Sequence, residues 1–112
     1  MSLADLRTVL IAGTGLADHQ VAENAVEQST PTPYIVITGQ TEPVYGLANN
    51  VQATGWKARV ECWAGTAAEA SDLADDATSA LLLDSRLVTL RATGHDPEVG
   101  LDATVLTVEW WD

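Results

Sequence analysis

The chain has 112 residues, 46% of them hydrophobic, and its sixteen acidic and five basic side chains give a net charge of −11. This length fits one domain over residues 1–112, large enough to bury a core without metal or disulfide support. The charge argues against tight nucleic-acid binding, which rests on Lys and Arg, and no run of about eighteen apolar residues could span a bilayer. The acids could form a solvated surface, line a passage for DNA, or imitate DNA toward a basic partner.

The start of the chain predicts a short helix over residues 2–12. Ser2 and Asp5 are typical of a helix start, and Gly13 supplies a stop. Apolar residues recur between them at helical spacing, namely Leu3, Leu6, Val9 and Leu10. Asp5 and Arg7 interrupt the apolar stretch and no basic segment precedes it, so we expect a cytosolic protein without a secretory signal.

A dinucleotide-binding loop is a competing interpretation of this stretch, because Gly13 and Gly15 match the first two glycines of a G-x-G-x-x-G motif. The third position holds Asp18, whose carboxylate would stand where a pyrophosphate approaches the helix start. No repeated strand-helix-strand units follow to form the parallel sheet of such folds. The helix is therefore the preferred interpretation.

The first clear strand follows a weakly patterned connection. Residues 13–32 contain a candidate extended piece at residues 20–22 and end in a turn-forming cluster. Residues 34–38 are a β-branched run directly after Pro33, where a missing amide is tolerated, so we expect a central strand there.

A long, hairpin-like loop is predicted over residues 39–54. This segment carries polar residues together with Pro43 and Gly46. Loops of this length in a compact domain are usually functional or disordered. Its Tyr45 and Leu47 favour a partner surface over a plain spacer.

Residues 56–82 have the clearest local pattern, a strand that leads directly into a helix. Residues 56–63 alternate with the period of two of a half-buried strand. Gly65 ends the alternation, and Thr66 with Glu69 forms a T-x-x-E capping box at a helix start. The side of the helix that packs on the sheet is predicted from its apolar stripe, which consists of Ala70, Leu73, Ala74, Ala77 and Leu81.

Two further strands, at residues 87–92 and 101–111, are predicted to pair antiparallel because the link at residues 94–100 is too short for a crossover. The expected fold class is α+β: an antiparallel or mixed four-stranded sheet covered by two helices, with a long loop between the first two main strands. The last strand ends in Trp110 and Trp111, whose rings face opposite sides. One of them needs cover from the first helix or from another subunit.

Catalytic and metal-binding patterns are weak in this sequence. His19 and His95 stand in turn-rich segments, and adjacent side chains such as His95 and Asp96 seldom converge on one metal ion or proton. Cys62 lies on the apolar face of a predicted strand, as a buried hydrophobe does. The acids Asp72, Asp75 and Asp76 have helical spacing but no EF-hand pattern. We therefore expect a protein that is not an enzyme and that uses no cofactor or metal.

The basic residues are more informative because they are scarce. Lys57 and Arg59 share a predicted strand face with Glu61 and Trp63, where they either pair with local acids or form an interface. A third strand position, Arg91, could also be exposed. The candidate interface residues are Tyr45, Leu47, Lys57, Arg59, Trp63, Arg91 and Trp111.

This order of elements resembles the tail-completion or tail-terminator proteins of long-tailed bacteriophages, small α+β proteins that form a ring at the head-proximal end of the tail tube. The match covers nearly the whole chain, although the middle and end are short for the family. Its features are the first helix, the strand Pro33-Tyr34-Ile35-Val36-Ile37, the long loop, the strand end Val60-Glu61-Cys62-Trp63-Ala64, the Ala-rich helix with Leu81-Leu82, and the last strand with Leu106-Thr107-Val108.

The resemblance implies a structural virion protein of the phage tail or neck, present in the host cytoplasm during assembly. Its implied partners are further copies of itself in a ring, commonly a hexamer, the tail tube protein and a head-completion or connector protein. DNA would pass through the lumen without specific binding, and no membrane is involved. In such a ring Lys57, Arg59 and Arg91 would meet acids of a neighbouring subunit.

Three alternatives stay open at this point. One is a head-side connector or stopper protein of the phage neck. Another is an acidic module that imitates DNA and inhibits a basic host protein. An enzyme with an unusual active site is a third, and it would need a polar, concave pocket near His19 or His95.

Overall fold

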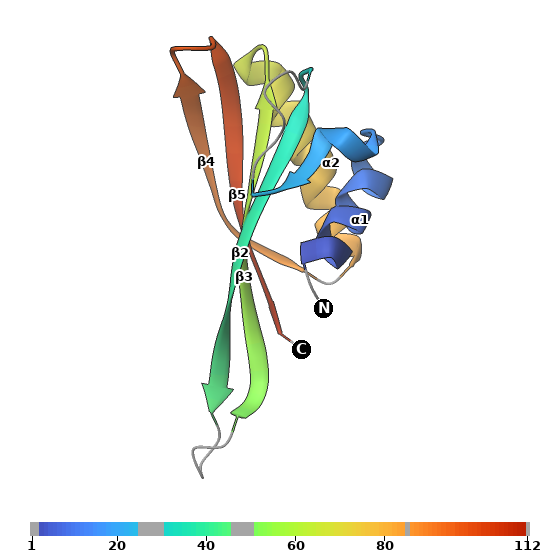
Figure 1. Ribbon diagram of the computed structural model, residues 1–112, viewed down its shortest axis with the longest axis vertical. Helices are drawn as coiled ribbons and strands as arrows, with labels where there is room; N and C mark the ends of the chain where they lie inside the picture. The colour runs from blue at the N-terminus through green and yellow to red at the C-terminus, as the bar shows by residue number, and fades with distance from the viewer. Residues whose placement is uncertain (1–2, 25–30, 46–50, 85, 112) are drawn as a thin grey trace.

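Two helices pack on one face of a twisted five-stranded sheet in the computed structural model (Figure 1). The structure describes residues 3–24, 31–45, 51–84 and 86–111, and within these all side chains except those of residues 40–45, 51–54 and 111. In chain order the elements are α1 (Leu3–Thr14), the 3-10 helix η1 (Asp18–Gln20), β1 (Val21–Glu23), β2 (Tyr34–Tyr45), β3 (Val51–Ala64), α2 (Ala67–Leu83), β4 (Leu87–Asp96) and β5 (Leu101–Trp111).

The sheet is mixed, with the strand order β1-β2-β3-β5-β4. β1 runs parallel to β2, and the other neighbouring pairs are antiparallel. The α+β class with two helices is therefore confirmed, but the sheet has five strands instead of four. The additional strand, β1, coincides with the extended piece predicted at residues 20–22. β5 lies between β3 and β4, so the strand after α2 takes the edge.

Most of the predicted loop at residues 39–54 is paired strand. The β2–β3 register runs from Tyr34 opposite Trp63 to Tyr45 opposite Val51, with an irregularity after Val44. Polar residues and Pro43 hid this ladder in the sequence, because they interrupt the apolar alternation by which a half-buried strand is predicted. Leu47 falls within residues 46–50, outside the described residues.

The helix α2 begins where the capping box predicted. The hydroxyl oxygen of Thr66 accepts a hydrogen bond of 3.2 Å from the backbone N–H of Glu69. The predicted stripe is buried, and Asp72, Asp75 and Asp76 are exposed on the other side. Small alanines in the stripe allow close approach of the helix to the sheet.

The first helix runs two residues beyond its predicted end. Gly15, with a φ of +72°, terminates it, and its N–H bonds to the Ile11 carbonyl at 3.0 Å. Gly13 lies inside the helix, where a Cβ would come within 2.2 Å of the Ala80 Cβ. Gly13 is thus a crossing point with α2, not a stop.

The core lies between the helices and the sheet. Its most buried members come from every element that faces it and include Leu6, Leu10, Ile35, Ile37, Val60, Cys62, Leu81, Leu106 and Val108. At the end near the chain terminus the rings of Trp56 and Trp110 stack with centroids 5.7 Å apart, and the Arg86 guanidinium lies 4.3 Å from the Trp110 ring. Trp110 is therefore the inward ring of the predicted tryptophan pair, while the Trp111 side chain lies outside the described set.

Candidate interaction surface

The sheet has one face that the helices leave uncovered. Alternation along the strands places Ala58, Val60 and Cys62 against the helices, and hence their neighbours in sequence on the other side. We call this side the open face; its side chains are Tyr34, Val36 and Thr38 of β2, Lys57, Arg59, Glu61 and Trp63 of β3, Leu90 and Ala92 of β4, and Val105, Thr107 and Glu109 of β5. The predicted shared face of Lys57, Arg59, Glu61 and Trp63 is therefore present.

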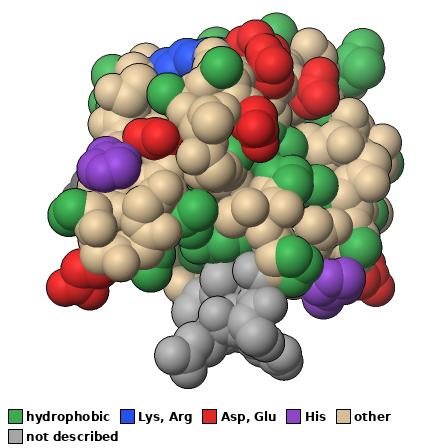
Figure 2. Space-filling model, turned by 90° about the horizontal axis from the view of Figure 1, so that it is seen from above, with side chains coloured by type: hydrophobic (Ala, Val, Ile, Leu, Met, Phe, Trp, Pro, Cys, Tyr) green, Lys and Arg blue, Asp and Glu red, His purple; other side chains and the backbone are tan. Residues whose placement is uncertain are grey.

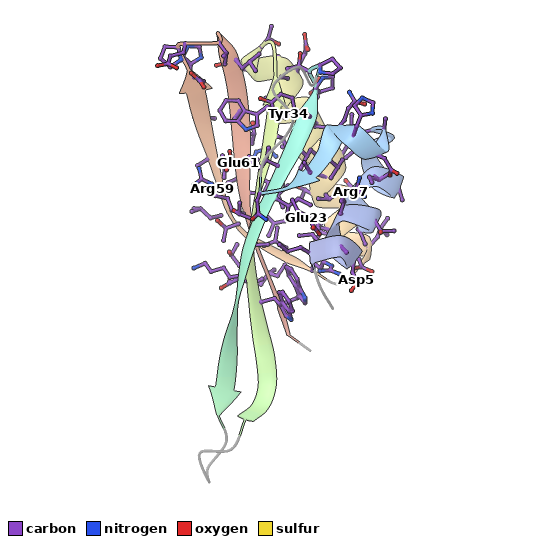
Figure 3. The ribbon with its side chains drawn as sticks, viewed as in Figure 1. Asp5, Arg7, Glu23, Tyr34, Arg59 and Glu61 are labelled. Carbon is purple, nitrogen blue, oxygen red and sulfur yellow. The ribbon has the colours of Figure 1, made fainter. Side chains whose placement is uncertain are left out.

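Glu61 organises the upper part of the open face. Its carboxylate accepts a hydrogen bond of 3.1 Å from the Trp63 Nε1–H and lies 3.4 Å from the Arg59 Nε. Figure 3 shows Arg59 and Glu61 close together on the sheet, with Tyr34 toward the same end. The Arg59 side chain is still 60% exposed. This pair leaves the guanidinium accessible to a further acid.

Tyr34 stays neutral over the physiological range. Burial raises the pKa of its hydroxyl above the ordinary value of 10.0, and the carboxylates of Asp96 and Glu61 raise it further. A neutral phenol both donates and accepts hydrogen bonds. The upper open face thus combines an aromatic surface with polar groups, a composition common in protein interfaces.

Lys57 lies lower on the open face, beside Arg59. It is exposed, and it makes no ion pair with any side chain that the structure describes. A shallow hollow of about 340 Å³ lies beside the two bases, lined by Thr38, Gly39, Lys57, Ala58, Arg59 and Thr107. Positive charge and a depression therefore coincide at the middle of the open face.

Arg91 lies on the other face of the sheet from Lys57 and Arg59, and it pairs with an acid of its own chain. Its Nη1 lies 2.8 Å from the Asp75 Oδ1, and its Nη2 donates to the Ser71 hydroxyl at 2.8 Å. The register slips between Val88 and Leu90. Such an irregularity shifts the alternation of side chains, which turns Arg91 toward α2.

Two of the other bases also hold the fold together. Arg7 Nε donates to the Val21 carbonyl at 2.6 Å, and its Nη2 to the Asp18 carbonyl, so it ties α1 to η1 and β1. Arg86 is buried and lies 2.7 Å from the Asp84 carboxylate. Of the five bases, Lys57 and Arg59 are the two that the open face presents.

Acidic side chains dominate the opposite side. Glu69, Asp72 and Asp76 are exposed on α2, where Asp75 is the acid that Arg91 neutralises. Figure 2, which views the molecule from above, shows acidic side chains at several places and Lys or Arg at one. The chain therefore has a basic spot on its open face and an acidic helix behind it.

The histidines lie elsewhere. His95 pairs with Asp102, its partner in the β4–β5 register, at 2.9 Å between Nδ1 and Oδ1, and not with the adjacent Asp96. This pair borders a hollow of about 430 Å³ with Ser71, Arg91 and Thr93. His19 is exposed in η1. The described residues contain no cluster of three or more His, Cys, Asp or Glu side chains placed to bind a metal.

Cys62 is fully buried, as predicted. Burial raises the pKa of its thiol from 9.0 to about 12. The thiolate is the nucleophilic form, so Cys62 is inert in the folded protein. Neither described helix is long and apolar enough to cross a membrane.

Comparison with other proteins adds no relative. No known family model matches the sequence. No curated protein matches it either. The resemblance to phage tail proteins thus rests on the order and pattern of the elements alone.

Proposed function

We propose that this protein is a structural subunit of a bacteriophage tail. In this proposal it forms a ring at the head-proximal end of the tail tube, stops tube polymerisation and joins the tail to the head-completion proteins. The observation that carries the proposal is the incomplete cover of the sheet: within the described residues both helices pack on one face, and Lys57, Arg59 and Trp63 lie on the other. A sheet face of this kind suits a subunit that is completed by neighbours.

The β2–β3 hairpin supports an assembling subunit. In chain order, Gly55 is the first β3 residue that pairs with β5, opposite Trp111, and β1 pairs with β2 only up to Ile37. Beyond Glu42, the described residues of β2 and β3 pair with each other alone. The molecule is accordingly elongated, 51 × 26 × 23 Å, with this hairpin projecting downward in Figure 1. An isolated two-stranded ribbon is marginally stable in water, so a partner surface would stabilise it.

Charge complementarity supports contact between copies. Lys57 and Arg59 lie on one side of the sheet, and the exposed acids of α2 lie on the other. Unlike surfaces on one subunit favour a head-to-tail contact, which closes into a ring when its rotation allows. The remaining acids would give the lumen a negative charge, so DNA would pass without sticking. The resemblance implies six subunits.

Electron microscopy of tail tubes tests the proposal. The purified protein is mixed with polymerising tail tube protein, and tube lengths and tube ends are scored. We expect short tubes with a cap at one end. Tubes of unchanged length with bare ends would contradict the terminator role.

Two pull-down assays with the same purified protein distinguish the head-side connector from the acidic DNA mimic. Binding to portal or head-completion protein without tube capping would indicate a head-side connector. Binding to a basic DNA-binding host protein, competed by duplex DNA, would indicate an acidic DNA mimic.

A further inference from the structure

The sheet has two edges that are unpaired within the described chain. β4 ends the strand order and pairs with β5 alone. At the other side β1 pairs with β2 only at residues 35–37. The last bond of this pairing is donated by the Asn24 N–H to the Ile37 carbonyl, at 2.7 Å. From Thr38 onward the outer edge of β2 has no described partner strand. Within the described residues, each chain therefore carries two rows of backbone donors and acceptors that pair with no strand.

The β4 edge has few of the features that keep an edge from pairing. Natural edges are protected by lysine, proline, inward charges or short strands. β4 has ten residues without lysine or proline, and the charge of Arg91 is paired with α2. Leu87 and Leu90 are 52% and 62% exposed. One irregularity after Val88, of the kind that protects natural edges, precedes residues 90–94, and these residues form a regular ladder with β5. The β4 edge is therefore open to pairing with a strand of another chain.

The strand directions match for a head-to-tail contact. β2 is antiparallel to β3, β3 to β5 and β5 to β4. β4 therefore runs opposite to β2. Two copies placed side by side in the same orientation bring β4 of one against β2 of the next in the antiparallel arrangement, which is the more common one.

The free part of β2 fixes the register. β1 blocks the edge up to Ile37, and Pro43 lacks an amide donor, so the available stretch is residues 38–42. Val36, Glu61, Val105 and Ala92 lie on one line across the sheet, because each is the partner of the next. Bringing Ala92 opposite a neighbour's Gln40 thus shifts the copies by the four residues from 36 to 40.

This shift suits a closed ring. Four residues of strand rise by about 13 Å, and the four strands β2, β3, β5 and β4 span about 19 Å. The strands then tilt by about 35° from the ring axis, which agrees with the tilt of closed β-barrels. A contact without this shift would collide with β1 of the neighbouring copy.

We infer that residues 90–94 of β4 pair antiparallel with residues 38–42 of β2 in a second copy of this chain. The contact joins the sheets of neighbouring subunits edge to edge, with Ala92 opposite Gln40 and Leu90 opposite Glu42. This inference rests on the self-association part of the proposed function and identifies the surface that performs it.

Cross-linking tests the inference. The double variant Gln40→Cys/Ala92→Cys is treated with a thiol cross-linker that reaches about 8 Å, which exceeds the roughly 5 Å between the Cβ atoms of directly opposite residues. Each copy then carries both halves of the contact, so we expect a covalent ladder of dimers, trimers and larger species. Each single variant should stay uncross-linked. A mixture of the two single variants should stop at dimers.

Several results would overturn the inference. Dimers from Ala92→Cys alone would show that β4 pairs with β4 about a two-fold axis. The absence of a ladder from the double variant, in samples that light scattering shows to be assembled, would also overturn it. The control Gln40→Cys/Val99→Cys moves one thiol to the exposed turn after β4 and should give no ladder. The native thiol of Cys62 is buried, so the cross-linker should not reach it.

A charge variant gives an independent check that needs no thiol. Leu90→Lys places a protective charge on the β4 edge and should abolish assembly, whereas Val99→Lys, at a residue equally exposed at 62%, should not. Thermal unfolding confirms that both variants fold. Equal assembly of the two variants would count against the inference.

The two proposals fail separately. A ladder without capped tubes would leave the edge contact standing and remove the tail role. Capped tubes with no ladder would leave the tail role and remove the edge contact.

Discussion

The five basic side chains show how the surroundings of a residue decide its role. Arg7, Arg86 and Arg91 each meet an acid or carbonyl of their own chain, while Arg59 stays 60% exposed beside Glu61. The sequence predicted the shared face of Lys57 and Arg59 because strand alternation is a local property. It could not place Arg91, since one irregularity in β4 reverses the alternation, and this irregularity has no local signature.

The Cys62 thiol gives a prediction at the residue scale. Its folded pKa of about 12 exceeds the ordinary 9.0, so the folded state keeps a proton that the unfolded state loses. The contribution to stability is complete below pH 9 and is lost as pH rises toward 12, by about 1.4 kcal/mol for each pH unit. The free energies of unfolding of wild type and Cys62→Ala are measured in denaturant from pH 8 to 11. Their difference at each pH gives the contribution of the thiol, because the titration of Tyr34 is common to both proteins and cancels. A difference that does not change with pH would contradict the burial of the thiol.

At the scale of elements, local patterns were predicted well and long-range neighbours poorly. The Thr66–Glu69 cap, the buried stripe of α2 and the β4–β5 hairpin follow from residues close in sequence. The insertion of β5 between β3 and β4, and the pairing of His95 with Asp102, depend on the register of whole strands. The pairing of His95 with Asp102 could have been predicted from the antiparallel register across the short β4–β5 turn. The part of the β2–β3 ladder within residues 39–54 had no apolar alternation in the sequence to reveal it.

The α1–α2 crossing gives a prediction at this scale. Gly13→Ala would place a Cβ within 2.2 Å of the Ala80 Cβ, so the helices must separate, at a cost of about 1–3 kcal/mol that outweighs the helix propensity of alanine. Gly65→Ala is the control, because nothing lies within 4 Å of that Cβ. Denaturant unfolding measures both variants.

A double-mutant cycle identifies the crossing as the cause. On its own, Ala80→Gly should lower the free energy of unfolding through its poorer helix propensity. In the double variant with Gly13→Ala, it should restore part of the stability that Gly13→Ala loses. Additive effects of the two substitutions would mean that the helices do not meet at this point.

At the scale of the whole molecule, the separation of charge explains how a chain of net charge −11 could associate with itself. Like charge repels copies at a distance, while the basic spot of Lys57 and Arg59 attracts acids at contact. The free edges of β2 and β4 supply the directional part of the contact. Because an edge contact joins the sheets side by side, Lys57 and Arg59 stay on the face opposite the neighbour's α2. The charge contact and the edge contact therefore use different surfaces of the subunit, and substitution separates the two.

The charge contribution is tested by Lys57→Gln/Arg59→Gln. We expect assembly to weaken about tenfold, since each exposed pair contributes up to about 1 kcal/mol. The control Ala17→Glu/Val99→Glu makes the same change in net charge at exposed positions outside α2 and the open face, and it should assemble normally. High salt should weaken the wild type toward the level of the variant. Assembly that strengthens with salt, equally in all three proteins, would indicate that repulsion dominates instead.

The most direct test of the central claim is the mass of the assembled protein in solution, measured by sedimentation over a range of concentrations, with class averages from electron microscopy of the same sample. The account predicts closed rings of one size, six copies of the 11.8 kDa chain, that stop growing once the ring is complete. Monomers at every concentration, with or without tail tube protein, would contradict it.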